Sequence, residues 1–124
     1  MKTRGFTLVE IMVVLAILVC LAAISIPNLL RARMTANEST AQATIKIIST
    51  AAETFAAATG AYPVAEANLT GATPPYLNRA YQGNTIQGYA YTYPTFAATG
   101  YCIQAAPASA AIGTNTYSIT TGGV

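Results

Sequence analysis

An acid at the start of a long apolar segment is the clearest sign of chemistry in this sequence. Glu10 ends the stretch Gly5-Phe6-Thr7-Leu8-Val9-Glu10, and between Ile11 and Ile24 no side chain is charged or strongly polar. An unpaired carboxylate that enters a bilayer costs about 3 kcal/mol. Glu10 therefore needs a cationic partner or a place near the lipid headgroups, and the identity of that partner bears directly on function.

The apolar segment that carries this acid is long enough to span a membrane. It runs from Phe6 to Ile26, and about 21 residues at about 1.5 Å each cover about 30 Å, the thickness of the hydrocarbon core. Because the segment is apolar on every side, it belongs in lipid or inside an assembly. Lys2 and Arg4 precede it and favour a cytoplasmic N-terminus. The chain is therefore expected to be a membrane protein at some stage.

The residues alone leave three interpretations of this N-terminus open. A secretory signal would be cleaved near Leu21-Ala22-Ala23, but Glu10 in the apolar core argues against it. A lipoprotein signal would end at Cys20, but Val19 is a poor fit because the residue before a lipidated cysteine is normally small. The third interpretation places cleavage on the cytoplasmic side, after Gly5, so that the whole apolar helix stays in the mature protein.

Residues 2–10 and Pro27 resemble the class III signal of the type IV pilin and type II secretion pseudopilin superfamily. The glycine, the aromatic residue, Thr-Leu and the acid occur in the register of that signal, and Pro27 lies where these proteins carry a helix-distorting proline. The resemblance is close over about the first 30 residues and looser at 59–63 and 120–124. It implies cleavage by a prepilin peptidase after Gly5 and N-methylation of Phe6.

The resemblance also implies a partner for Glu10. Cleavage after Gly5 frees the amino group of Phe6, which stays cationic when it is methylated once. A carboxylate on one subunit and an amine on its neighbour attract each other far more strongly in low dielectric than in water. We therefore expect Glu10 to set the register of assembly. The alternative is an acid that snorkels to the headgroup region, since Glu10 lies near one end of the segment.

The helix is expected to continue beyond the apolar segment to about residue 60. Pro27 lacks an N–H and crowds the preceding turn, which predicts a kink or local melting there. Gly60 is expected to cap the helix and Pro63 to prevent its continuation. Apolar residues in this part recur at spacings of three, four and seven, the pattern of one helical face. They are Leu30, Met34, Ala41, Ile45, Ile48, Ala52 and Phe55.

The remaining residues are expected to form a small head on the amphipathic part of the helix. Residues 61–87 are rich in Gly, Pro, Asn and Thr and are typical of a connecting loop. Strand patterns at 88–93, 100–105 and 116–120 predict an antiparallel sheet of about three strands, with Pro94 at a strand end or on an edge. The fold class is thus the α+β pilin fold. The expected divisions are 1–5 (leader), 6–27 (transmembrane and assembly half of the helix), 28–60 (amphipathic half) and 61–124 (head).

Composition argues against catalysis and against a metal or cofactor. The chain has no histidine and no aspartate, so Ser-His-Asp triads and histidine metal sites cannot form. Glu66 is the only acid of the head, too few for the calcium site typical of major pseudopilins. Cys20 and Cys102 lie too far apart to suggest a disulfide. After cleavage the charged side chains balance, which gives no support for a nucleic-acid partner.

The resemblance implies a structural subunit of a type IV pilus-like filament rather than an enzyme. Its partners would be other copies of itself, other pilins, prepilin peptidase, the pilus assembly platform of the inner membrane and, before assembly, membrane lipid. The subunit would first span the inner membrane with its N-terminus in the cytoplasm and later become part of an extracellular filament. The alternatives are a periplasmic pseudopilin of a type II secretion system and a solitary signal-anchored domain.

Overall fold

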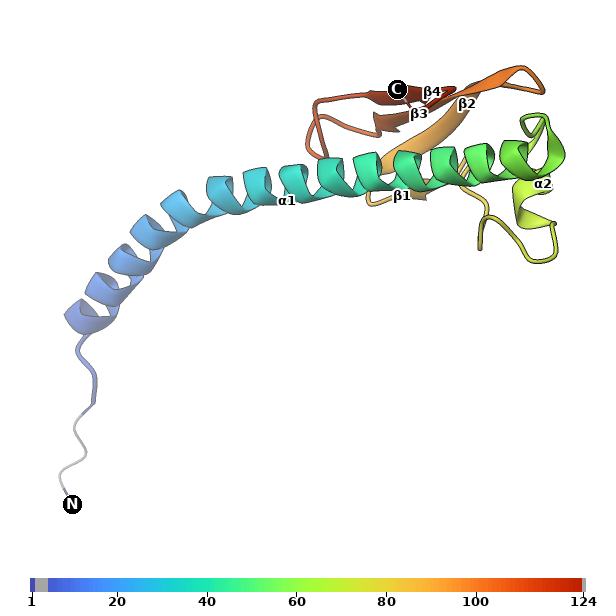
Figure 1. Ribbon diagram of the computed structural model, residues 1–124. Coiled ribbons are helices and arrows are strands. Elements are labelled where there is room, and N and C mark those ends of the chain that lie inside the picture. Colours follow the sequence, from blue (N-terminus) through green and yellow to red (C-terminus); the bar gives the residue numbers. More distant parts are fainter. Residues whose placement is uncertain (2–4, 124) are drawn as a thin grey trace. The chain divides into compact units, whose positions relative to one another are not determined.

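The chain folds into two compact units, Met1–Arg33 and Met34–Val124. The computed structural model describes Met1 and residues 5–123, so most of the expected leader lies outside the described residues. One long helix contributes to both units, and all other elements belong to the second (Figure 1). The elements are α1 (Leu8–Thr59), α2 (Glu66–Thr70), β1 (Thr85–Ile86), β2 (Tyr89–Ala97), β3 (Gly100–Pro107) and β4 (Tyr117–Thr120).

The first unit consists of the apolar part of α1 and the residues before it. Its large apolar side chains are exposed from Phe6 to Leu30, and α1 is long and apolar enough there to cross a membrane. The helix continues through Pro27, so the predicted local melting is not observed. Pro27 removes only its own N–H from the helix, and the leucines and arginines that follow it are good helix formers. A bend at Pro27 stays a prediction.

In the second unit, one face of α1 packs against the sheet, which lies along it (Figure 1). Four residues of the predicted apolar face are buried, which confirms that part of the pattern: Ala41, Ile45, Ile48 and Ala52. The prediction was wrong for Leu30, which is exposed. Leu30 belongs to the first unit, whose described residues contain no element other than α1 to cover it.

The helix ends where its residues predict. Gly60 has a φ of +83°, in the left-handed region that favours glycine, and its N–H donates to the carbonyl of Ala56 at 2.8 Å. Pro63 follows and is fully buried. These two residues turn the chain from the helix into the segment that leads to the sheet.

The sheet is an antiparallel meander in the order β1-β2-β3-β4. This confirms the α+β fold class and the three predicted strands, which correspond to β2, β3 and β4. Strand β1 was not predicted, because a strand of two residues is too short to show an alternating pattern. It also treated 61–87 as loop throughout, whereas this segment contains both α2 and β1.

Pro94 lies inside β2 rather than at its end. The pairing of β2 with β3 shifts register between Thr92 and Thr95, so that Pro94 occupies an irregular part of the ladder. On its other side β2 pairs with β1 only at Tyr89 and Ala90. A bulge of this kind tolerates proline because the missing N–H breaks no regular ladder bond.

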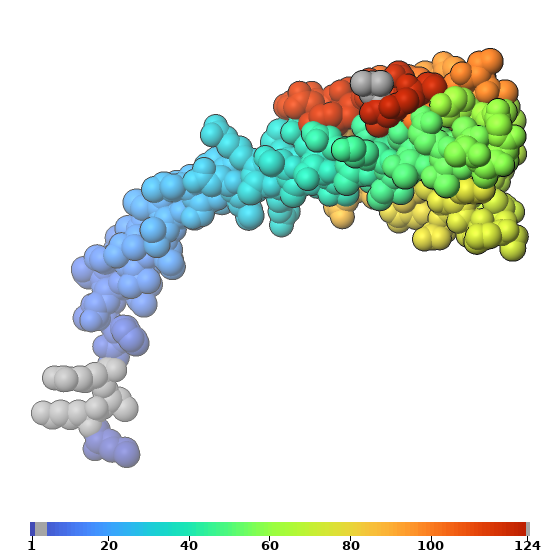
Figure 2. Space-filling model, in the orientation of Figure 1, coloured from blue at the N-terminus to red at the C-terminus, as the bar shows by residue number. Residues whose placement is uncertain are grey.

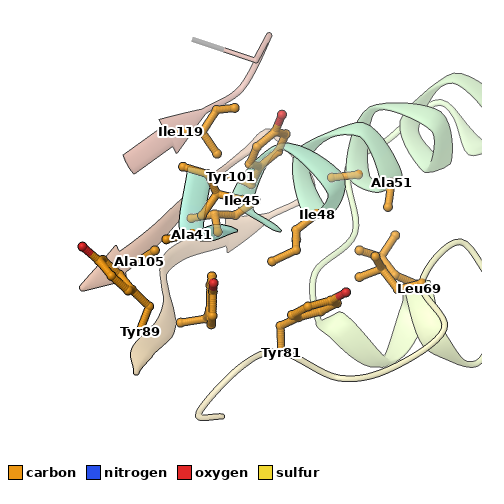
Figure 3. Close-up of a cluster of buried hydrophobic side chains, with 14 residues drawn as sticks. Ala41, Ile45, Ile48, Ala51, Leu69, Tyr81, Tyr89, Tyr101, Ala105 and Ile119 are labelled. Atoms are coloured by element: carbon orange, nitrogen blue, oxygen red, sulfur yellow. The ribbon is translucent and has the colours of Figure 1, made fainter. Parts of the chain in front are cut away.

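The core of the second unit forms between α1 and the sheet, and tyrosines supply much of it (Figure 3). Strand β3 alternates buried and partly buried residues, as expected for a sheet with one covered face. Tyr89 and Tyr91 are the largest fully buried side chains. The buried apolar residues outside α1 are Leu69, Leu77, Tyr81, Tyr89, Tyr91, Tyr101, Ile103, Ala105 and Ile119.

Candidate functional site

Glu10 and Thr7 bind each other through three hydrogen bonds at the start of α1. The N–H and the hydroxyl of Thr7 donate to Glu10 Oε2 at 2.7 and 2.9 Å, and the N–H of Glu10 donates to Thr7 Oγ1 at 3.2 Å. This is a capping box, in which the two side chains satisfy backbone N–H groups that the first helical turn leaves unpaired. Sequence reasoning missed it, although a threonine three residues before a glutamate and an apolar run is its usual signature.

The capping box leaves part of the carboxylate available. Both donors from Thr7 bind Oε2, and among the described residues Oε1 of Glu10 accepts no hydrogen bond. The side chain is exposed. Glu10 is thus held in one orientation by its own helix and still presents one oxygen and a full negative charge.

Gly5 and Phe6 precede the helix in an exposed, non-helical segment. Phe6 is 84% exposed, and a side chain placed at Gly5 would meet no atom within 4 Å. The peptide bond between them is therefore open to an enzyme. The structure brings Gly5, Phe6 and Glu10 together at one end of the chain, whereas Pro27 lies about 25 Å further along the helix.

In the second unit, Glu38 and Glu53 project from α1 and hold the segments before and after β4. Glu38 Oε1 accepts from the N–H of Thr114 at 3.1 Å. Glu53 Oε1 accepts from the N–H of Gly122 at 2.8 Å and from the hydroxyl of Tyr101 at 2.9 Å, and Oε2 accepts from Tyr62. The backbone donors Thr114 and Gly122 lower the pKa of Glu38 and Glu53, respectively, because they stabilise the ionised forms.

Glu66 is a buried carboxylate that sequence reasoning considered only as a metal ligand. It is 6% exposed and accepts from the N–H groups of Tyr81 at 2.7 Å and Gln82 at 3.1 Å, and from the hydroxyl of Tyr93. Glu66 therefore ties α2 to the segment before β1 and to β2. Within the described residues no three His, Cys, Asp or Glu side chains gather as a metal site would require.

The two cysteines are free, and the carboxylates do much of the cross-linking in the second unit. Glu38 and Glu53 connect α1 to the last third of the chain, and Glu66 connects the segment after α1 to the sheet. Because these contacts are long-range, they hold the sheet on α1 and on the segment that follows it, as covalent links would.

The buried tyrosines Tyr91 and Tyr101 give a matched test of this network. The hydroxyl of Tyr101 lies 2.7 Å from Ser49 Oγ and donates to Glu53, whereas the buried hydroxyl of Tyr91 has no partner among the described residues. We expect Tyr101→Phe to lower the free energy of unfolding by about 2 kcal/mol and Tyr91→Phe to leave it unchanged or raise it. Thermal unfolding in detergent, followed by near-UV circular dichroism, measures both. Equal losses in the two variants would contradict the network.

The lowered pKa values predict acid sensitivity. Folded Glu38 and Glu53 bind protons less readily than in the unfolded chain, so their contribution is fully present above the usual pKa of 4.5 and is lost as the pH falls below it. We expect the unfolding temperature of the second unit to hold between pH 7 and about 5 and to fall below about 4.5. The double variant Glu38→Gln, Glu53→Gln should have a lower unfolding temperature at pH 7, and this temperature should fall less steeply as the pH is lowered. An equally steep fall in that variant would contradict the assignment of the acid sensitivity to Glu38 and Glu53.

The N-terminal residues that include Gly5, Phe6 and Glu10 also match a known family. Residues 1–26 match the family model described as the prokaryotic N-terminal methylation motif. The type IV major pilin protein PilA of Myxococcus xanthus is 36% identical over 101 residues, which are 82% of this chain and 40% of that protein. The type IV wide pilus major component PilA4 of Thermus thermophilus is 53% identical over 38 residues, 31% of this chain and 29% of that protein. The chain thus spans less than half the length of either relative.

The methylation motif over residues 1–26, the two similarities and the long helix on a small antiparallel sheet support the type IV pilin superfamily as the class of this protein.

Proposed function

We propose that this protein is a pilin, the structural subunit of a type IV pilus-like filament. The observation that carries the proposal is the first unit, an apolar half-helix exposed on all sides that begins with a capped, exposed acid. Such a surface must be covered by lipid or by other protein chains. Two type IV pilus components are similar to this chain, and that similarity supports the second kind of cover after an initial period in the membrane.

Cleavage after Gly5 would create a cationic partner for Glu10. The new amino group of Phe6, methylated once, stays cationic. The helix begins at Leu8, so this amine and the carboxylate lie near the same end of the subunit. Pairing between neighbours at a fixed stagger lets two charges in an apolar environment neutralise each other, and Oε1 of Glu10, which accepts no hydrogen bond among the described residues, can accept the bond. Assembly would then depend on processing, since the uncleaved chain has no such amine.

Each part of the chain would have its own role in cleavage, membrane anchoring and assembly. Residues 1–5 are the leader that prepilin peptidase removes, and 6–27 anchor the precursor in the inner membrane and later pack in the filament core. Residues 28–60 support the head, 61–124, which would cover the filament surface. The assembly platform of the inner membrane would move the subunit from lipid into the filament. Pro27 would allow the helix to bend where these environments meet.

The mass of the mature N-terminus tests this proposal. We expect the protein purified from its native membrane or from sheared filaments to begin at N-methyl-Phe6. A chain that retains Met1, or one that begins near Ile24 after signal-peptidase cleavage, would contradict the proposal. Intact-mass spectrometry with N-terminal sequencing distinguishes the three outcomes directly.

Imaging of the cell surface separates the proposed pilin from a type II secretion pseudopilin. A pilin should be found in long filaments that shear from cells and react with antibodies against this chain. A pseudopilin would carry the same processed N-terminus but stay in the periplasmic fraction.

A further inference from the structure

The face of the sheet that is turned away from α1 carries small, uncharged side chains. On β3 the residues that alternate with the buried ones point to this face, and their cross-strand partners on β2 and β4 point the same way. All of them are exposed or half-buried. Figure 2 shows β4 and the residues around it, in red, at the surface of the second unit. The outer face consists of Ala90, Thr92, Thr95, Cys102, Gln104, Ala106, Ser118 and Thr120.

No charged side chain lies in the part of the chain that forms this face. Between residues 80 and 124 the sequence contains no Asp, Glu, Lys or Arg, and the chain has no His. The carboxylates that bind this region, those of Glu38, Glu53 and Glu66, come from α1 and α2 rather than from the sheet. An exposed sheet without charges lacks the usual protection against association with its own copies.

The chemistry of the outer face fits a second outer face better than it fits a charged or an aromatic partner. Hydroxyl and amide groups both donate and accept hydrogen bonds, so the face is complementary to its own copy. A charged partner would lose water there without gaining an opposite charge. None of the side chains of the face is aromatic, so it offers no ring to a planar ligand. Small side chains also let two sheets approach to about 10 Å.

The free edge of β4 is less suited to a partner than the face. Strand β4 is the last strand of the sheet and has four residues. The carbonyl of Thr120 already accepts from the N–H of Gly123 at 3.0 Å. Glu38 and Glu53 bind N–H groups of the segments before and after this strand. An added strand would thus find few free backbone groups with which to pair.

The area of the outer face decides what kind of association it supports. Three strands about 4.8 Å apart and about five residues of about 3.3 Å give a face on the order of 250 Å². A stable protein–protein interface buries about 800 Å² on each partner. One such contact therefore does not hold two free subunits together, whereas many contacts repeated along two filaments act at once.

We propose that the outer face is a self-association surface through which heads on neighbouring filaments stack and hold the filaments side by side. The inference rests on the proposed function and adds to it the partner of the outer face, which is the same face of another copy. The contact is isologous, so residues near its centre meet their own copies. Cys102 and Gln104 are the central residues, because β3 lies between β2 and β4.

A charge at the centre of the outer face tests the proposal. Gln104→Lys adds a cation to every copy of the face, whereas Gln82→Lys adds the same charge at an exposed position before β1. We expect both variants to enter filaments. The share of sheared filaments in bundles, measured by low-speed sedimentation and electron microscopy, should fall at least about tenfold for Gln104→Lys and stay near the wild-type value for Gln82→Lys.

A second variant guards against a folding defect at Gln104. Ser118→Lys, at a more exposed position of the same face, should reduce bundling as Gln104→Lys does and keep the near-UV spectrum of the second unit. Normal bundling of these two variants would overturn the inference, and so would wild-type filaments that do not associate.

The salt dependence separates this face from an association of opposite charges. The screening length falls from about 30 Å at about 0.01 M to about 3 Å at about 1 M ionic strength. Wild-type bundles should persist over this range, because no charge pair holds them, and Gln104→Lys filaments should regain part of their association as salt rises. Wild-type bundles that disperse in salt would show that charged residues such as Lys46 or Arg79 form the contact, and would overturn the inference.

Cys102 gives a second measurement of the contact. A short bismaleimide joins two thiols without an oxidant, and Cys20→Ala removes the other cysteine of the chain. We expect a two-copy adduct through Cys102 in bundled filaments and much less of it in Gln104→Lys filaments. An equal yield in single filaments would place the contact within one filament and overturn the inference. If wild type is not found in filaments, the proposed function itself fails; if its filaments stay single, only the self-association surface fails.

Discussion

Replacing Glu10 by leucine should leave cleavage after Gly5 intact and reduce entry of the subunit into filaments by at least about tenfold. The leucine makes the precursor easier to hold in the membrane, because it removes the charge from the apolar segment. It also removes the proposed partner of the Phe6 amine, so an incoming subunit would have to bury that cation unpaired. A loss of about 1.4 kcal/mol is enough for a tenfold effect. The ratio of cleaved protein in sheared filaments to cleaved protein in membranes measures it.

The capping box at the start of α1 requires two controls for this experiment. Glu10→Gln keeps an oxygen that can accept from Thr7 and removes the charge, since glutamine also serves at this position of a capping box. Thr7→Ala removes the cap and keeps the charge. If charge pairing drives assembly, Glu10→Gln should fail like Glu10→Leu and Thr7→Ala should assemble. The reverse pattern would show that Glu10 acts only by capping its own helix.

The cap formed by Thr7 and Glu10 illustrates what the sequence could reveal. The spacing of Thr7 and Glu10 is visible in the sequence and is typical of a capping box. The acid was instead interpreted by the cost of placing its charge in an apolar segment, so the cap was not predicted. Gly60 and the face containing Ile45 and Ile48 were predictable because their signals are local: a glycine in the left-handed region and a helical period.

Features that depend on distant partners could not be predicted in this way. The burial of Glu66 follows from three donors that come 15 to 27 residues later in the chain. Strand β1 has two residues and is defined only by its pairing with β2.

The largest loss of stability should come from Glu66→Ala. The substitution leaves the N–H groups of Tyr81 and Gln82 and the hydroxyl of Tyr93 without their acceptor. A buried donor left without a partner costs about 1 to 3 kcal/mol, so we expect a loss of about 4 kcal/mol, close to the whole stability of a marginal domain. Near-UV circular dichroism in the tyrosine band reports on this unit alone, since all eight tyrosines lie in it and the chain has no tryptophan.

A double-mutant cycle of Glu66 and Tyr93 distinguishes the loss of hydrogen bonds to Glu66 from a simple loss of packing. Tyr93→Phe removes one donor and leaves Glu66 bound to two N–H groups, so its cost should be about 1 to 2 kcal/mol. In the Glu66→Ala background the same change should cost much less, because the hydroxyl of Tyr93 has already lost its acceptor. Glu38→Ala, which removes a less enclosed carboxylate, should be far milder than Glu66→Ala. Additive losses for Glu66 and Tyr93 would mean that the carboxylate is not their shared acceptor, and the cross-linking role of Glu66 would then have to be abandoned.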